Sequence, residues 1–371
     1  MEKPKQAWNK KLDADLRALG YVNSPIMPCI YSKIRGEEWV YLLVYVDDII
    51  GAGNASYFDS DLDKIAALYP SNNLGFPQWI LGMRIQRGDG WVTLDQSQYA
   101  HKLLEKWGML DCKPLGSPVD PNFRPSRRQD EPEDDLPPSA PPKAVVNNYA
   151  EDVGAFGYLA NCTRPDLAAF VNFRSRSLTN YDDADLQALK RGKRYLKLTS
   201  NFGLKWTFNP QASDIVGYSD SDWASDYTDR KSTSGYVFKR HGAAISWQTK
   251  KQPTPALSST EAELYALTST FKEALAWRNR LTSMSVPLQK PTKVFCDSQG
   301  ALALIRAPAS RDSTKHISIR SFFARDAIDR QEIVTEYVAS ADNAADALTK
   351  GLSPEKMRTA LNLFGLVRID G

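Results

Sequence analysis

The sequence is poor in cysteine and histidine, and it contains no long apolar run. Four cysteines, Cys29, Cys112, Cys162 and Cys296, stand far apart among 371 residues, and there are only three histidines. A zinc site or a disulfide framework is therefore not expected, and reduced thiols in an intracellular protein are the simpler interpretation. No segment approaches the roughly 20 apolar residues of a membrane span, and the first residues lack the apolar stretch of a signal peptide.

The chain also lacks a strong excess of charge of either sign. The 47 basic and 44 acidic residues leave a formal net charge of +3, and 42% of the residues are hydrophobic. So small a surplus does not by itself indicate a nucleic-acid-binding protein, because the local distribution of charge decides such binding. A chain of 371 residues is long enough for two or three domains with sizeable cores.

The N-terminal part of the chain alternates between helical and extended patterns. Apolar residues at helical spacing predict a helix over residues 7–20. Residues 28–50 are rich in strand-forming residues and carry turn residues at 36–37 and 47–48, so they predict two hairpins. A second helix is expected over residues 57–70, because the helical pattern there ends in a proline.

The composition changes in the middle of the chain. Nine prolines occur between Pro114 and Pro142, around the acidic run at 130–135. This composition is typical of a linker or of an extended surface segment. Two helices are expected after it, and from Ile215 onward the predicted order is three strands, a helix, a strand, a helix and further strand and helix segments.

Two adjacent acids interrupt an otherwise apolar stretch near the N-terminus. Asp47 and Asp48 lie between YLLVYV and II in the segment VYLLVYVDDIIGAG, residues 40–53. One interpretation is a hairpin turn, where aspartate is an ordinary residue. The other is a metal-binding hairpin, because two-metal nucleotidyl transfer needs rigidly held carboxylates and Mg²⁺ prefers hard oxygen ligands. The short motif alone leaves both interpretations open.

Acidic residues also occur in four predicted elements of the last third of the chain. These are a strand at 215–226, a helix at 258–281, a strand followed by a helix at 293–305, and another such unit at 332–350. An acid at the end of a buried strand is costly unless it is paired or binds a metal. Because the strand ends of such a layout can converge, we expect these segments to contribute acids to one cluster.

Several segments resemble copia-type retrotransposon Pol proteins in their order and spacing. The YVDD sequence at 45–48 is similar to the hairpin of reverse transcriptases, and the last third of the chain resembles the RNase H of the same family. The further matching segments are KQAW at 5–8, WILGMRI at 79–85, LDQSQYAHKLLEKWGMLDCKP at 94–114 and GYLANCTRPDLAAFVN at 157–172.

The resemblance implies an α/β (α+β) fold. A partial reverse-transcriptase palm, thumb and connection would precede an RNase H-like mixed five-stranded sheet with helices. The expected regions are a partial palm and thumb-like region at 1–118, a Pro-rich acidic linker at 119–148, a helical connection at 149–212, an RNase H domain at 213–351 and a C-terminal tail at 352–371.

The resemblance also implies which acids bind metal and act in catalysis. They would hold two Mg²⁺ ions, with Mn²⁺ as an alternative, for attack of water on an RNA phosphate. The residues that match are Asp220 in GYSD, Glu263 in EAELYAL, Asp297 in CDSQGAL and Asp346 in DNAADALTK, together with Asp47 and Asp48 of the YVDD pair.

Each of these acids has a structural alternative. Asp222 and Asp226 compete with Asp220 as the acid at the strand end, and Glu261 competes with Glu263. Two helical residues two positions apart point about 200° apart, so only one of the two glutamates can face the metals. The apolar stripe of the helix flanks both, and only the resemblance selects Glu263. The two remaining acids have the alternatives of a helix cap and a solvated helix residue.

In the family, the YVDD acids act with a further aspartate on a strand upstream of KQAW. We expect that strand to be absent from this chain. Asp13 and Asp15 lie on a predicted helix, from which they would not converge on the hairpin tip. The resemblance therefore implies that Asp47 and Asp48 are the remnant of a polymerase site, and polymerase activity is not expected of this chain alone.

The predicted function is Mg²⁺-dependent endonucleolytic cleavage of the RNA in RNA–DNA hybrids by a retrotransposon Pol fragment. The alternative is a catalytically inactive relic or a co-opted nucleic-acid-binding protein. The expected partners are the hybrid and the remainder of a Pol protein, without a membrane, in cytoplasmic virus-like particles or in the nucleus. Cationic side chains would contact the phosphates of the hybrid, and an aromatic ring would lie near its sugars. The candidates are Trp247, Lys250, Lys251, Arg230, Lys231, Lys315 and Arg320.

Overall fold

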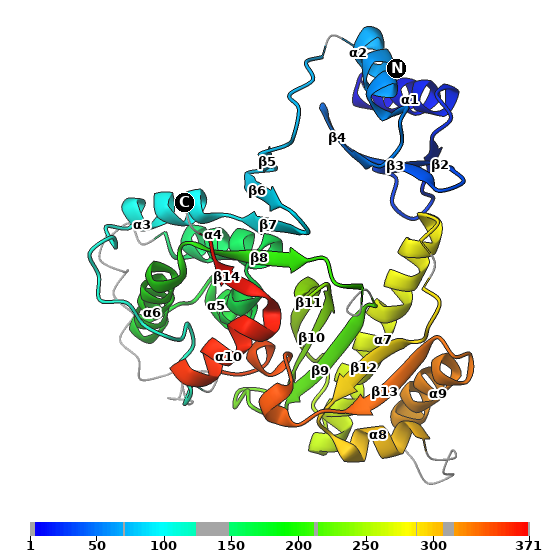
Figure 1. Cartoon of the computed structure of the whole chain (residues 1–371). Coiled ribbons are helices and arrows are strands. Elements are labelled where there is room, and N and C mark those ends of the chain that lie inside the picture. Colours follow the sequence, from blue (N-terminus) through cyan, green and yellow to red (C-terminus); the bar gives the residue numbers. More distant parts are fainter. Residues whose placement is uncertain are drawn as a thin grey trace. The chain divides into compact units, whose positions relative to one another are not determined.

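The chain forms two compact units (Figure 1). The first consists of Met1–Gln78 and Leu275–Gln289, and the second of Trp79–Ala274 and Lys290–Gly371. No described helix is long and apolar enough to cross a membrane. The computed structural model describes residues 4–69, 71–123, 148–210, 214–286, 288–306 and 315–369, with the side chains of 4–7 and 315–318 excepted.

An antiparallel four-stranded sheet and two helices make up most of the first unit. The strands lie in sequence order, and the two predicted hairpins are confirmed. Leu12 and Leu16 of the first helix, Val40 and Leu42 of the sheet and Ile65 of the second helix share one apolar cluster. The elements are α1 (Pro4–Ala18), β1 (Val22–Asn23), β2 (Ile30–Arg35), β3 (Glu38–Tyr45), β4 (Asp48–Gly53) and α2 (Phe58–Leu68).

The second unit contains an antiparallel sheet in the order β14-β8-β7-β6-β5, accompanied by four helices. The last of these helices begins where the Asp182 carboxylate accepts the Asp185 N–H (2.9 Å), a capping box that the sequence encodes locally. The elements are β5 (Trp79–Ile80), β6 (Met83–Gly88), β7 (Trp91–Asp95), β8 (Phe202–Thr207), β14 (Leu366–Arg368), α3 (Ser97–Lys106), α4 (Tyr149–Cys162), α5 (Ala168–Arg174) and α6 (Asp183–Thr199).

The second unit also contains the predicted mixed five-stranded sheet, which is confirmed. Its order is β11-β10-β9-β12-β13, with antiparallel pairing from β11 to β9 and parallel pairing from β9 to β13. Figure 1 shows β9 between β10 and β12 in this sheet. The elements are β9 (Val216–Asp222), β10 (Thr233–Arg240), β11 (Ala243–Lys251), α7 (Ser259–Ser283), β12 (Thr292–Cys296), α8 (Gln299–Arg306), α9 (Lys315–Asp329) and β13 (Ile333–Tyr337). From Leu275 onward, the residues of α7 belong to the first unit.

The end of the chain differs in detail from the expectation. Residues 346–348, expected in a helix, form a single 3-10 turn. Within 352–371, expected as a tail, α10 (Pro354–Phe364) is followed by β14, which pairs with β8. The helix buries Met357 and Phe364, so apolar burial fixes this segment. The predicted linker falls largely on residues outside the described ones, and the predicted region boundaries remain a prediction.

The helices before the mixed sheet share one apolar core with that sheet. Phe156 of α4 and Phe170 of α5 belong to the same buried cluster as Val237 of β10, Leu348 and Phe364. Because one continuous core connects these elements, the expected connection helices and the expected RNase H sheet stabilise each other.

A buried ion pair closes the turn between α4 and α5. Arg164 is 1% exposed, and its Nε and Nη2 donate to the two carboxylate oxygens of Asp166 at 2.9 and 2.7 Å. The Nη1 atom donates to the Thr199 carbonyl (2.8 Å), and the Tyr195 hydroxyl donates to Asp166 (2.7 Å). A buried charge is tolerated when it is paired and fully hydrogen-bonded in this way.

Replacing Asp166 with Asn should destabilise the protein by about 3–5 kcal/mol, because it leaves the Arg164 charge buried without a counter-ion. Urea unfolding measures the effect. The matched control is Asp120→Asn, which removes a half-exposed partner of Arg191 and should cost at most about 1 kcal/mol. Equal midpoints for both variants would contradict the assignment of Arg164 and Asp166 as a structural pair.

Candidate active site

Asp220 lies in the centre of the mixed sheet, near the end of β9. Its side chain is 2% exposed, and its cross-strand partner on β10 is Gly235. A Cβ atom on Gly235 would lie 2.7 Å from Leu348 Cβ and 2.9 Å from Thr349 Cγ2. Glycine is therefore required there, because its lack of a side chain lets the segment after Asp346 approach Asp220.

Glu263 reaches the same place from the second turn of α7. Its side chain is 8% exposed, and its Oε1 accepts the Ser221 N–H at 3.2 Å. Glu261, the alternative, is turned elsewhere, and its Oε2 accepts the Leu257 N–H at 2.7 Å in front of the helix. The structure thus brings Glu263, and not Glu261, to Asp220.

Asp297 and Asp346 complete the cluster. Asp297 follows β12, and its Oδ2 accepts the Ser340 hydroxyl at 2.6 Å. One ligand oxygen from each of Asp220, Asp297 and Asp346 lies within 4.8 Å of the others, and the same spacing holds for Glu263, Cys296 and Asp297. Asp297 belongs to both groups, so the four predicted acids form one contiguous set of ligands.

Burial and mutual repulsion raise the pKa values of three acids in this cluster. Burial, joined by the charges of Asp220 and Asp297, raises the pKa of Glu263 to about 9. Burial raises the pKa of Asp220 to about 7, with Asp346 and Asp297 adding to the effect and Lys350 opposing it. Burial is also the largest cause of the raised pKa of Asp346. Acids in such a site ionise more readily when a cation joins them.

The donor set fits hard divalent metal ions. Glu263 Oε2 is buried and has no hydrogen-bond partner among the described residues, so a ligand atom is available there. Carboxylate oxygens are the ligands that Mg²⁺ and Mn²⁺ prefer. Burial raises the pKa of the Cys296 thiol well above its ordinary value, and a protonated thiol is a poor metal ligand. The four carboxylates are therefore the relevant donors.

Two residues of the site were missed by the sequence reasoning, Thr349 and Lys350. The Thr349 hydroxyl donates to Asp220 Oδ2. The Lys350 Nζ lies 2.6 Å from Asp346 Oδ1 and 4.0 Å from Asp220 Oδ2. A lysine four positions after an acid in the segment DALTK was the available signal, because such spacing favours an ion pair in a helical turn.

Asp47 and Asp48 lie at the β3–β4 turn and are exposed. Val46, before them, adopts φ +54°, and its carbonyl accepts the indole N–H of Trp8 at 3.2 Å. The Asp13 carboxylate accepts hydrogen bonds from Arg17 and Tyr31, and the Asp15 carboxylate accepts one from Tyr69. Among the described residues, the pair belongs to no group of three potential metal ligands.

The residues predicted to contact nucleic acid lie in different environments. The Trp247 indole donates inward to the Ala160 carbonyl (2.7 Å). Lys251 forms ion pairs with Asp226 and with Asp229 (3.0 Å to the latter). Lys231 forms an ion pair with Asp229. The guanidinium groups of Arg230 and Arg320 stack on the rings of Tyr227 and Tyr265, respectively. The Lys315 side chain lies outside the described ones.

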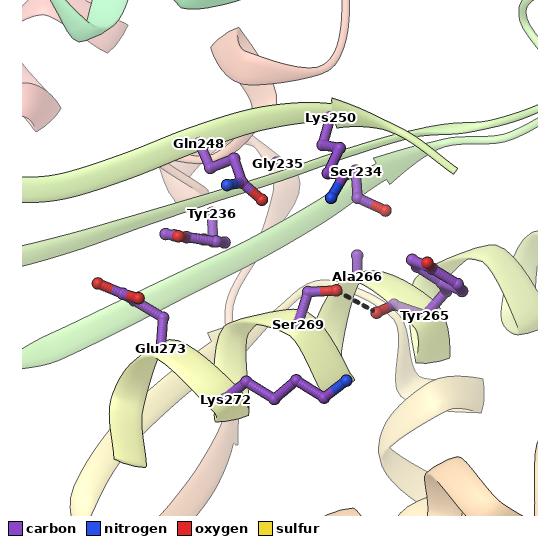
Figure 2. A pocket seen from close by; sticks show the side chains of 10 residues that line it. All are labelled: Ser234, Gly235, Tyr236, Gln248, Lys250, Tyr265, Ala266, Ser269, Lys272 and Glu273. Atoms are coloured by element: carbon purple, nitrogen blue, oxygen red, sulfur yellow. Dashed lines mark hydrogen bonds between the residues drawn. The ribbon is translucent and has the colours of Figure 1, made fainter. Parts of the chain in front are cut away.

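Lys250 lines a cavity of about 310 Å³ between the β10–β11 hairpin and α7. Figure 2 shows Lys250 on the strand side and Lys272 on the helix side, with Ser269 between them on α7. Neither lysine forms an ion pair with a described acid within 4.0 Å. Gly235 also lines the cavity and is the cross-strand partner of Asp220. The cavity therefore shares the backbone of one residue, Gly235, with the strand pair that holds Asp220.

Comparison with known proteins identifies relatives among reverse transcriptases and Pol polyproteins. The family described as "Reverse transcriptase (RNA-dependent DNA polymerase)" matches residues 1–121. The retrovirus-related Pol polyproteins from transposon TNT 1-94 of Nicotiana tabacum and transposon RE1 of Arabidopsis thaliana are 33% and 32% identical over 98% of this chain. The chain spans 27% and 24% of their lengths. The mitochondrial protein AtMg00810 of Arabidopsis thaliana is 33% identical over 64% of this chain and 94% of its own length.

Solved structures show more distant likenesses. LC11-RNase H1 in complex with an RNA/DNA hybrid covers 37% of this chain and 94% of that chain, with 14% identity and a TM-score of 0.30. The foamy viral protease-reverse transcriptase in complex with an RNA/DNA hybrid covers 81% of this chain and 36% of that chain, with 14% identity and a TM-score of 0.42.

On the strength of its sequence relatives, the chain belongs to the Pol polyprotein family of copia-type retrotransposons.

Proposed function

We propose that this chain cuts the RNA strand of RNA–DNA hybrids endonucleolytically, with divalent metal ions, as an RNase H-type nuclease. The convergence of Asp220, Glu263, Asp297 and Asp346 from four separate elements carries the proposal. Family membership supports the choice of substrate, because RNA-dependent DNA synthesis leaves a hybrid whose RNA has to be removed. The products would be a 5′-phosphate and a 3′-hydroxyl.

The chain's own residues would act by holding carboxylate oxygens in fixed positions for metal binding. Asp220, Glu263, Asp297 and Asp346 would hold the Mg²⁺ or Mn²⁺ ions, and Asp297 lies in both groups of potential ligand atoms. Hydrogen bonds from Ser221, Ser340 and Thr349 orient Glu263, Asp297 and Asp220, respectively. When bound, such ions supply an activated water and stabilise the leaving 3′ oxygen. DNA synthesis is not part of the proposed function, because Asp47 and Asp48 have no third potential metal ligand beside them among the described residues.

The cavity between the β10–β11 hairpin and α7 is the proposed contact surface for a phosphate of the hybrid. Lys250 and Lys272 line it from opposite sides, and neither forms an ion pair with a described acid. Lysine binds phosphate as a point charge and releases counter-ions from the nucleic acid. Lys231, whose charge is paired with Asp229, is a weaker candidate than Lys250.

The first prediction separates the two glutamates of α7. Glu263→Gln should lower hybrid cleavage in Mg²⁺ by more than about a hundredfold, because residues that only orient metal ligands already contribute 10–100-fold. Glu261→Gln, the matched control, should retain activity close to that of the unaltered protein. A labelled RNA–DNA duplex and a gel assay measure both. Hybrid binding by the folded, unaltered protein without cleavage would favour a non-catalytic binding protein instead.

The second prediction concerns the pH dependence of stability without metal. The folded pKa values of Asp220, about 7, and Glu263, about 9, lie above the unfolded values of about 4. Protonation of these acids therefore stabilises the fold fully below about pH 4, and this contribution is lost as the pH rises through 7 and 9. In chelator-treated samples, the thermal midpoint of Glu263→Gln should exceed that of the unaltered protein by more at pH 9 than at pH 5. Parallel curves would contradict the assigned shift.

The third prediction tests the cavity. Lys250→Gln and Lys272→Gln should each weaken hybrid binding and reduce the slope of log affinity against log salt by about 0.7–0.9, the value for one lost phosphate contact. Lys293→Gln serves as the control, because Lys293 lies at the start of β12 and pairs with Glu336. Fluorescence anisotropy at several salt concentrations gives the slopes. An unchanged slope in the two cavity variants would remove this surface from the proposal.

A further inference from the structure

One cation contacts the acidic cluster directly. Lys350 Nζ lies 2.6 Å from Asp346 Oδ1 and 4.0 Å from Asp220 Oδ2. No other described lysine or arginine lies within ion-pair distance of the four acids. Asp346 and Asp220 are two of the three carboxylates in the second group of potential metal ligands. Lys350 therefore occupies the side of the cluster that a metal ion would also use.

This contact lies in a less solvated environment than an ordinary ion pair on the surface of a helix. Asp220 is 2% exposed, and its other short contact is the Thr349 hydroxyl. Charges in such an environment interact strongly, because little water screens them. Burial alone would lower the pKa of Lys350, but the charges of Asp220 and Asp346 raise it above its ordinary value. The ammonium and the carboxylates thus stabilise one another while no metal is present.

The position of Lys350 also allows it to leave. Its side chain is 38% exposed, and four rotatable carbon–carbon bonds carry the ammonium. A divalent ion that takes oxygens of Asp220 and Asp346 as ligands would repel a neighbouring ammonium and weaken its contacts. The side chain can then turn toward solvent without a change in the backbone.

We propose that Lys350 is a built-in cation that stabilises the metal-free acidic cluster and competes with divalent metal, so that it is displaced from Asp346 and Asp220 when metal binds. This inference rests on the metal-binding role of the site in the proposed function. It makes Lys350 a determinant of metal affinity and not a metal ligand. Because such coupling is reciprocal, metal weakens the lysine contact as much as the lysine weakens metal binding.

The test compares Lys350→Met, which keeps most of the stem and removes the charge, with Lys350→Arg, which keeps the charge. Lys356→Met is the control for a more distant charge, because Lys356 lies outside ion-pair distance of the acids and its charge only weakly opposes the raised pKa of Asp346. Mn²⁺ binding is followed by the electron paramagnetic resonance of free Mn²⁺. Thermal unfolding is measured in chelator and in Mg²⁺.

Lys350→Met should bind Mn²⁺ at least about fivefold more tightly than the unaltered protein, a change within the usual range of coupling. Its thermal midpoint should be lower in chelator and should recover in Mg²⁺. Lys350→Arg and Lys356→Met should bind Mn²⁺ within about twofold of the unaltered protein. Unchanged or weaker binding by a folded Lys350→Met would overturn the inference.

A measurement on the unaltered protein does not depend on any variant folding. Amine-selective acetylation, read by mass spectrometry, should modify Lys350 faster after Mg²⁺ is added, with Lys356 as the internal reference. A rate that stays constant or falls would speak against displacement. If the protein cuts hybrids but Lys350 affects neither readout, only this inference fails. If Lys350 controls Mn²⁺ affinity and no hybrid is cut, only the nuclease proposal fails. If no Mn²⁺ binds, both fail.

Discussion

Repulsion among four carboxylates at one end of the mixed sheet is the constraint on which this structure depends. Asp220 and Glu263 are buried, and the half-buried Asp297 and Asp346 lie close to them. Such an arrangement is unfavourable by itself, because burial and like charges both oppose ionisation. The fold tolerates it because each acid is attached to a different rigid element. Donors from Ser221, Ser340, Thr349 and Lys350 offset part of the cost.

The rigidity comes from a core that extends beyond the mixed sheet. Apolar side chains of α4 and α5 pack with those of β10 and α10 in one cluster, and β14 at the chain's end pairs with β8. Within that core, the Arg164–Asp166 pair satisfies its charges almost entirely by hydrogen bonds. The helices before the sheet therefore contribute to holding the segment that carries Asp346, and Gly235 provides the space that this segment needs.

The two acidic sites of the chain differ in their surroundings. Asp47 and Asp48 are exposed at a hairpin turn, where water solvates their charges and little energy is stored. In the second unit, Asp220 and Glu263 are buried, and burial raises the pKa values of Asp220, Glu263 and Asp346, which is typical of functional sites. Of the two predicted sites, the second thus has the physical properties of a metal centre in this structure.

The sequence alone determined most of the elements, and its resemblance to the family named the acids. Period-two strands, turn residues at the hairpins and the capping residues of α6 are local signals, and local signals survive in any tertiary context. The resemblance to the family selected all four acids, including Glu263. The resemblance also implied a mixed five-stranded sheet, and the structure gives its strand order.

Only the tertiary structure decided which side chains meet. Glu261 and Glu263 both flank the apolar stripe of α7, so the helical pattern did not separate them and only the resemblance selected Glu263. In the structure, Glu263 accepts the Ser221 N–H of β9 and Glu261 accepts the Leu257 N–H. The inward bond of Trp247 and the contact of Lys350 with Asp220 join residues 87 and 130 positions apart. No local pattern encodes such distances, because they arise from the packing of whole elements. The sequence therefore named the acids, and the packing decided what surrounds them.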